Sequence, residues 1–185
     1  MGGTLGTLFA RAAGGKARAG ALEEAVQGAD ALLLAVHWCR IDDVLNQVGD
    51  FSGKVVVSCL PPLNVQNTEH ILGHTTSGAE AFAKEVPDAE VVSAFNNIPS
   101  EVLFGVFEAR GSAAPPSMAD GGDNQTAKSL AATLVRDVGF GPVDAGPLRI
   151  ARYTEPFALL VSWLAYRAEG GPELGYWFER FRPEA

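Results

Sequence analysis

The stretch Ala31-Leu32-Leu33-Leu34-Ala35-Val36, which follows Gly28-Ala29-Asp30, decides the fold. Two further apolar runs of the same kind occur downstream, at 54–60 (KVVVSCL) and 90–95 (EVVSAF). None of the three alternates apolar with polar residues. Each is therefore typical of a strand that is buried on both faces, as in a parallel sheet covered by helices.

Segments of helical length lie before and between these runs, at 22–27, 41–48 and 77–86. The third opens with Ser77-Gly78-Ala79-Glu80, which predicts a capping box in which Ser77 and Glu80 satisfy each other's backbone donors. Short buried strands that alternate with helices predict right-handed crossovers. The fold class expected is therefore α/β, with a Rossmann-type, doubly wound, mostly parallel sheet.

The second half of the chain continues the same alternation. A weak strand is expected near 117–120, a helix over 124–138 with Asp123 as its N-cap, and a last strand over 140–145. A helix is expected from Thr154, with Pro156 in its first turn, where a missing N–H costs nothing.

That last helix is apolar almost all round, which predicts burial inside the monomer or against another subunit. We expect two parts, a Rossmann-like domain over 1–150 and a short C-terminal helical extension, or lobe, over 151–185.

The composition excludes several classes of partner. The 185 residues carry a net charge of -8 and no basic run, which argues against a nucleic acid or an anionic membrane surface. Cys39 and Cys59 form no C-x-x-C pair, so a disulfide scaffold or a zinc site is not expected. The most apolar segment, 157–166, is about half as long as a membrane span requires. No signal peptide is visible, and we expect a cytoplasmic protein.

The glycine-rich beginning, Met1-Gly2-Gly3-Thr4-Leu5-Gly6, runs into apolar residues at helical spacing. It is similar to the back half of a G-x-G-x-x-G turn, in which glycines let the backbone approach a pyrophosphate at a helix N-terminus. An ordinary glycine-rich helix start would give the same pattern. The strand that should precede such a turn is not in the sequence, so we expect the first strand of the fold to be missing.

Several segments together resemble the coenzyme F420-dependent NADP oxidoreductases, a family that moves hydride between a deazaflavin and NADP. The matching stretches are Gly2–Gly6, 28–38, 53–57, 91–98, 138–148 and 151–156. The resemblance implies a Rossmann domain with a C-terminal lobe, usually in a homodimer. It also implies that a second strand is missing after Gly14, and with it the residues that hold the 2′-phosphate.

The resemblance implies a set of cofactor-binding residues. Near the pyrophosphate it places Gly2, Gly3 and Thr4; along the nucleotide crevice Ala35, Val36, His37, Trp38, Ser58 and Cys59; and facing the nicotinamide or the second substrate Phe95, Asn96 and Asn97. The placement agrees with the rule that ligands of open α/β sheets bind outside the carboxyl ends of the strands. Asn96 and Asn97 have a second interpretation, as side chains that cap a turn before Pro99.

The sequence also departs from the family pattern. Pro61 replaces an asparagine that follows the second visible strand, and His37 stands where proline is common. These departures leave the affinity for the cofactor and the choice between NADP and NAD open.

Histidine and cysteine are the residue types that could carry chemistry here. His37 is the candidate catalytic residue, because it follows a strand at the crevice and an imidazole transfers protons near neutral pH. Cys59 has no visible base, and a buried cysteine is usually a small hydrophobe. His70 and His74 have the i, i+4 spacing of metal ligands, but Gly73 interrupts a helix there and no third ligand is visible, so no metal site is expected.

The function expected is hydride transfer between NADP(H) and a deazaflavin or a related electron partner, in a cytoplasmic homodimer that binds neither nucleic acid nor membrane. Direct hydride transfer needs no acid or base from the protein. Two alternatives stay open. In the first, the chain is a degenerate or non-catalytic Rossmann-like protein that binds a nucleotide or has a structural role. In the second, it is a truncated product of an active parent gene.

Overall fold

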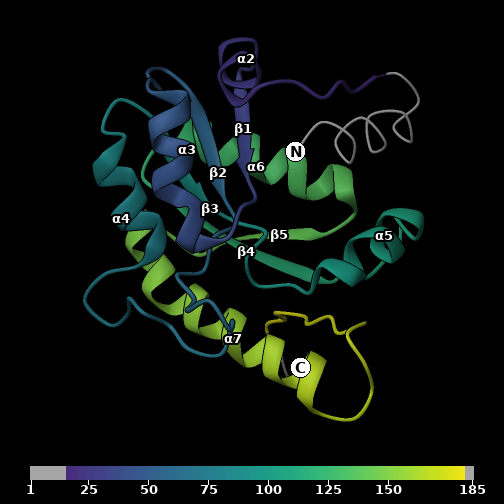
Figure 1. The fold of residues 1–185 in the computed structure, drawn as a ribbon. Helices are drawn as coiled ribbons and strands as arrows, with labels where there is room; N and C mark the ends of the chain where they lie inside the picture. The colour runs from purple at the N-terminus through teal and green to yellow at the C-terminus, as the bar shows by residue number, and fades with distance from the viewer. Residues whose placement is uncertain (1–15, 182–185) are drawn as a thin grey trace.

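The computed structural model describes residues 16–181, so the predicted contacts of Gly2, Gly3 and Thr4 lie outside the described residues. A five-stranded sheet forms the centre of the fold (Figure 1). Its strands, in spatial order, are β1 (Ala31–Leu34), β2 (Val55–Ser58), β3 (Glu90–Ser93), β4 (Ser117–Gly122) and β5 (Gly141–Asp144). The β1–β2, β2–β3 and β4–β5 pairs are parallel, and β3–β4 is antiparallel. The predicted Rossmann-type, mostly parallel sheet is confirmed.

The helices connect the strands and cover both faces of the sheet. They are α2 (Leu22–Gln27), α3 (Ile41–Val48), α4 (Gly78–Glu85), α5 (Ser100–Glu108), α6 (Gln125–Val138) and α7 (Ala151–Arg167), with 3-10 turns η1 (Trp38–Arg40) and η2 (Leu148–Ile150). Helix α5 was not predicted, because Pro99 provides no side-chain cap and Gly105 interrupts the helical pattern.

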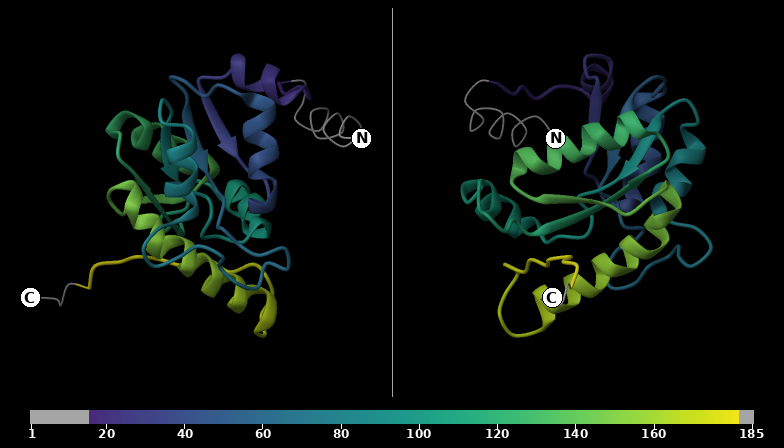
Figure 2. Two further views of the ribbon diagram at one scale, coloured as in Figure 1. Left: turned by 60° about the vertical axis from the view of Figure 1, so that its left-hand side comes forward. Right: turned by 180° about the vertical axis from the view of Figure 1, so that it is seen from behind.

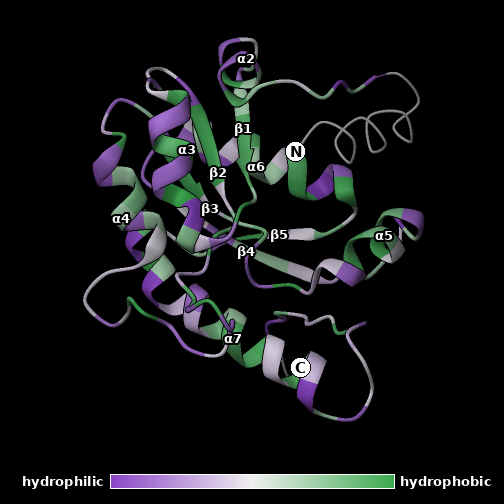
Figure 3. Cartoon of the chain, in the orientation of Figure 1, coloured by the Kyte–Doolittle hydropathy of each residue, from purple (hydrophilic) through white to green (hydrophobic). Residues whose placement is uncertain are grey.

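Side chains that alternate along the strands enter two different cores. Val56 and Val91 pack with Phe82 of α4 on one face, whereas Val57 and Val92 pack with Ala127 of α6 on the other. Figure 2 shows α6 on the side of the sheet opposite to α3 and α4, and Figure 3 shows how apolar the strands between them are. Burial on both faces explains why these strands read as continuous apolar runs.

Strand β1 lies at the edge of the sheet. Within residues 16–181 it pairs with β2 alone, and the Leu33 side chain is 57% exposed. The predicted absence of a first and a second strand stays a prediction.

Two predicted helix starts are wrong. Asn124, and not Asp123, caps α6: its Oδ1 accepts hydrogen bonds from the backbone N–H groups of Thr126 and Ala127. The Asp123 carboxylate instead accepts from the N–H of Leu148. Helix α7 begins at Ala151, because η2 leads directly into it, and Pro156 therefore lies inside the helix.

Only one side of α7 is buried in the monomer, so burial of the other side against another subunit, the second of the two predicted environments, stays a prediction. The buried residues are Ala151, Glu155, Ala158, Val161 and Ala165, and the exposed ones include Tyr153, Leu160, Trp163 and Leu164. None of the helices within residues 16–181 is long and apolar enough to cross a membrane.

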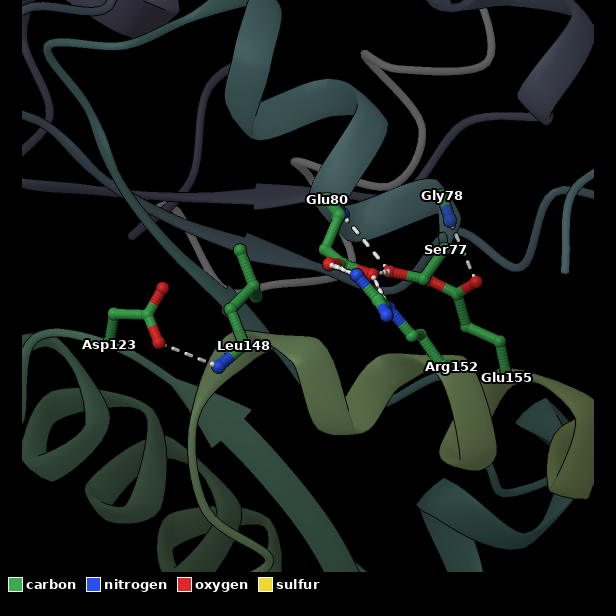
Figure 4. A network of polar contacts seen from close by, with 7 residues as sticks. All are labelled: Ser77, Gly78, Glu80, Asp123, Leu148, Arg152 and Glu155. Carbon is green, nitrogen blue, oxygen red and sulfur yellow. Dashed lines mark hydrogen bonds and ion pairs between the residues drawn. The ribbon is translucent and has the colours of Figure 1, made fainter. Parts of the chain in front are cut away.

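A polar clamp joins α7 to the N-terminus of α4 (Figure 4). The Glu155 carboxylate, which is 1% exposed, accepts the backbone N–H groups of Gly78 at 2.8 Å and Ala79 at 2.9 Å. These two donors belong to the first turn of α4 and have no partner within the helix. Burial raises the pKa of Glu155 to about 7, and the two N–H groups oppose that rise.

The second half of the clamp is an ion pair between Arg152 and Glu80, with N···O distances of 2.8 and 2.6 Å. The predicted capping box is therefore half correct. The Ser77 hydroxyl accepts the N–H of Glu80, as predicted, but the Glu80 carboxylate binds Arg152 and the Ser77 hydroxyl instead of a backbone donor. The hydrogen bond from Arg152 lowers the pKa of Glu80.

The clamp predicts that Glu155→Gln destabilises the fold. A glutamine amide presents one NH₂ group to a backbone N–H, so at least one buried donor loses its acceptor, at a cost of about 1–3 kcal/mol. Urea unfolding at pH 8 measures the change, with Glu108→Gln on the exposed surface of α5 as the matched control. An unchanged unfolding free energy in Glu155→Gln would show that the Glu155 half of the clamp contributes nothing.

Candidate functional site

A cavity of about 590 Å³ opens at the carboxyl ends of β1 and β2. Its walls are made by the residues that follow β1, by the turn after β2 and by the C-terminal half of α7. The lining residues are Ala35, Val36, His37, Trp38, Cys59, Pro61, Leu63, Asn67, Ser162 and Tyr166. We call it the strand-end cavity. Five of the predicted cofactor-binding residues line it: Ala35, Val36, His37, Trp38 and Cys59.

The position of Trp38, which lines the strand-end cavity, depends on a close approach at Gly78. A Cβ atom there would lie 3.0 Å from the carbonyl oxygen of Leu60 and 3.2 Å from the Trp38 ring. Real Cβ atoms seldom come this close to their neighbours, so a larger residue would push α4 away from the turn after β2. Glycine at 78 therefore lets the start of α4 pack against Trp38.

Helix α7 supplies the wall opposite the strands. Ser162 and Tyr166 are one turn apart and both face the strand-end cavity. The Tyr166 hydroxyl donates to the Glu101 carboxylate at 2.7 Å, which ties the end of α7 to the start of α5. Burial, together with this hydrogen bond, raises the pKa of Tyr166 to about 12, so the phenol stays protonated at neutral pH.

The chemistry of the walls is largely apolar. The Cys59 thiol donates to the carbonyl oxygen of Leu34 at 3.0 Å, and burial raises its pKa to about 11. A thiol held in this form is a poor nucleophile. The His37 side chain is exposed at the rim. Within residues 16–181, no group of three or more histidines, cysteines and carboxylates is placed to hold a metal ion.

Among the described residues, four predicted positions do not line the strand-end cavity: Ser58, Phe95, Asn96 and Asn97. Ser58 is buried at the end of β2, and its hydroxyl has no hydrogen-bond partner among the described residues. Phe95 is half-buried in the core and has a left-handed backbone, with φ of 60°. This strained residue turns the chain sharply at the end of β3.

Asn96 and Asn97 form an internal hydrogen-bond chain. Asn96 Nδ2 donates to the Ser93 hydroxyl at 2.9 Å, and Asn97 Nδ2 donates to Asn96 Oδ1 and to the Ala119 carbonyl oxygen, both at 3.0 Å. Asn97 has no exposed surface. In this structure the two amides fix the turn after β3, in line with the second interpretation of these residues, and their contact with a cofactor stays a prediction.

Tyr176 completes that chain, and sequence reasoning missed it. Its hydroxyl donates to Asn97 Oδ1 at 2.6 Å and accepts the N–H of Ala119 at 3.3 Å. The ring packs edge-on against Phe157 of α7. The C-terminal segment is therefore fastened beside β4, as the view from behind in Figure 2 shows. No local pattern could reveal a contact across 79 positions of the chain.

The chain is similar to known redox proteins in sequence and in fold. Residues 5–62 match the sequence family described as NADP oxidoreductase, coenzyme F420-dependent. A rat protein, metalloreductase STEAP3, is 31% identical over 143 residues, which are 76% of this chain and 28% of that protein. The chain thus spans less than a third of this curated relative.

Two solved structures share the fold. One is a protein of Arthrobacter sp. FB24, provisionally classed as an F420-dependent NADP reductase, with TM-score 0.77, 23% identity and coverage of 87% of this chain and 74% of that one. The other is a hypothetical protein of Sinorhizobium meliloti, with TM-score 0.70, 26% identity and coverage of 95% and 82%.

The hydrogen-bond chain predicts a modest loss of stability in Tyr176→Phe. The variant keeps the ring and removes one hydroxyl, so Asn97 Oδ1 loses its donor inside the protein, at a cost of about 1–3 kcal/mol in the free energy of unfolding. Chemical denaturation measures this loss. Tyr153→Phe, on the exposed side of α7, is the matched control. Equal stability of the two variants would contradict the structural role given to Tyr176.

Proposed function

Because the chain belongs to the coenzyme F420-dependent NADP oxidoreductase family, we propose that it binds NADP(H) in the strand-end cavity and exchanges a hydride between the nicotinamide and a deazaflavin of the F420 type. One observation carries the proposal: the cavity lies at the carboxyl ends of β1 and β2, lined by Ala35, Val36 and Trp38. Open α/β sheets bind their ligands at this edge.

The proposed reaction asks for a dry, well-shaped site and not for an acid or a base. The cofactor supplies the chemistry when bound, since the hydride leaves the dihydronicotinamide with both bonding electrons and the oxidised deazaflavin takes up that hydride and one proton from solvent. The protein's part is to hold two flat rings close together and exclude water. The apolar faces of Val36, Trp38 and Leu63 suit this task.

Polar groups at the cavity have proposed roles in orientation. His37, exposed at the rim, and Ser162, on the α7 wall, can reach the amide or phosphate groups of a bound cofactor. Ser58 and Cys59 are proposed to line the nucleotide crevice, and Phe95, Asn96 and Asn97 to support the nicotinamide end. Gly2, Gly3 and Thr4 are proposed to bind the pyrophosphate.

The exposed apolar side of α7 supports a homodimer. Leu160, Trp163 and Leu164 are 53%, 62% and 45% exposed, and a surface of this kind usually marks an interface. We propose that a second copy covers it, that the protein acts in the cytoplasm, and that residues 1–150 and 151–185 form the cofactor domain and its helical extension.

The proposal is tested by titrating the full chain with NADPH and with NADH, followed by nicotinamide fluorescence. We expect saturable binding with a preference for NADPH, and loss of oxidised F420 absorbance when the deazaflavin is added. Ser162→Trp fills the cavity from α7 and should weaken binding at least tenfold. Thr126→Trp, exposed on α6 and distant from the cavity, should leave binding unchanged.

No saturable binding at concentrations up to about 1 mM would overturn the proposal, because working substrate affinities lie below that range. Saturable binding without hydride transfer to any acceptor would favour the alternative, a non-catalytic nucleotide-binding protein. Equal binding by wild type and Ser162→Trp would move the cofactor site away from the strand-end cavity.

A further inference from the structure

A second cavity, of about 360 Å³, lies between α6 and the β4–β5 pair. Because β4 runs antiparallel to β3, the carboxyl ends of β4 and β5 point away from the strand-end cavity. The second cavity is lined by Asp120, Gln125, Lys128, Ser129, Ala132, Thr133, Arg136, Pro142 and Asp144. None of these residues takes part in the proposed hydride transfer, so the α6 cavity is independent of it.

The Asp120 carboxylate is the unusual group in the α6 cavity. Asp120 is 2% exposed, and its Oδ2 is buried without a hydrogen-bond partner among the described residues. Buried polar groups are nearly always hydrogen-bonded, and an unpaired buried carboxylate is costly. Burial raises the pKa of Asp120 to about 6, the nearby charge of Asp144 adds to the rise, and Lys128 and Arg136 oppose it.

Three other charged side chains line the α6 cavity, two positive and one negative: Lys128, Arg136 and Asp144. Lys128 is 9% exposed, and its Nζ lies 2.7 Å from Asp144 Oδ1. Arg136 lies two turns further along α6 on the same side of the helix. Asp120 and Asp144 are directly paired neighbours in the sheet. Two carboxylates and two cations therefore line one small space.

We propose that the α6 cavity binds a neutral, hydroxyl-rich ligand, a sugar whose adjacent hydroxyls donate to Asp120 and accept from Lys128 and Arg136. A hydroxyl is both donor and acceptor, so it satisfies a carboxylate and a cation at once. An anion would meet Asp120 and Asp144, and a cation would meet Lys128 and Arg136. The volume lies near the lower end of the usual range for ligand sites, about 300–1,000 Å³, and suits one sugar ring.

The sugar has two possible sources, free monosaccharide or the ribose of a nucleoside, and the experiment separates them. Saturation-transfer NMR on the full chain uses D-ribose, D-glucose and adenosine as probes. We expect saturable binding of at least one probe and a loss of at least tenfold in affinity in Asp120→Asn. The matched control is Asp137→Asn, which removes one exposed carboxylate from the same helix outside the α6 cavity.

A thermal melt of each variant shows whether a loss of binding comes from the missing side chain or from a loss of folding. Asp120→Asn removes a buried carboxylate whose pKa is raised by the fold, so above pH 6 it should melt no lower than wild type. If that variant does not fold, Arg136→Gln carries the test, since Arg136 is exposed, and a threefold or greater loss of affinity is then expected.

Three results would overturn the proposal. The first is no saturable binding of any sugar or nucleoside probe. The second is equal binding by wild type and by Asp120→Asn, or by Arg136→Gln if Asp120→Asn does not fold. The third is that inorganic phosphate or Mg²⁺ alone binds the α6 cavity in an Asp120-dependent way while the sugars do not. Because the residues differ, each of these results can occur whether or not NADPH binds the strand-end cavity.

Discussion

The buried Glu155 carboxylate at the N-terminus of α4 is the contact on which the rest of the site depends. It occupies the two free N–H groups of the first turn of α4 and fixes α7 against that helix. Two and three turns further along, the same α7 places Ser162 and Tyr166 opposite the ends of β1 and β2. The wall of the strand-end cavity is thus positioned by two hydrogen bonds made near the other end of the helix.

The reversal between β3 and β4 is the second organising constraint. Parallel strands put their carboxyl ends at one edge of a sheet, and one antiparallel step sends the following pair to the opposite edge. The carboxyl ends of β1 and β2 therefore lie on one side of the sheet and those of β4 and β5 on the opposite side, and a cavity lies at each. The walls differ: the strand-end cavity is largely apolar, as a flat redox ring requires, whereas the α6 cavity is lined by balanced charges.

Features specified by local pattern could be predicted from sequence, and features specified by distant contacts could not. The strands around Leu33, Val56 and Val92 were predicted because burial on both faces leaves an unmistakable apolar run, and Ala35 to Trp38 follow from the end of such a strand. Ser162, Tyr166 and Tyr176 reach their places through the packing of α7 and the C-terminal segment. The earlier start of α7 has the same cause, since η2 continues into it.

A crystal structure of the full chain with NADP⁺ tests the central claim most directly. We predict that the nicotinamide lies at the carboxyl ends of β1 and β2, between Trp38 and Tyr166, with the α4–α7 clamp intact. Density for the nicotinamide at another surface, with the strand-end cavity filled only by solvent at saturating NADP⁺, would contradict the account.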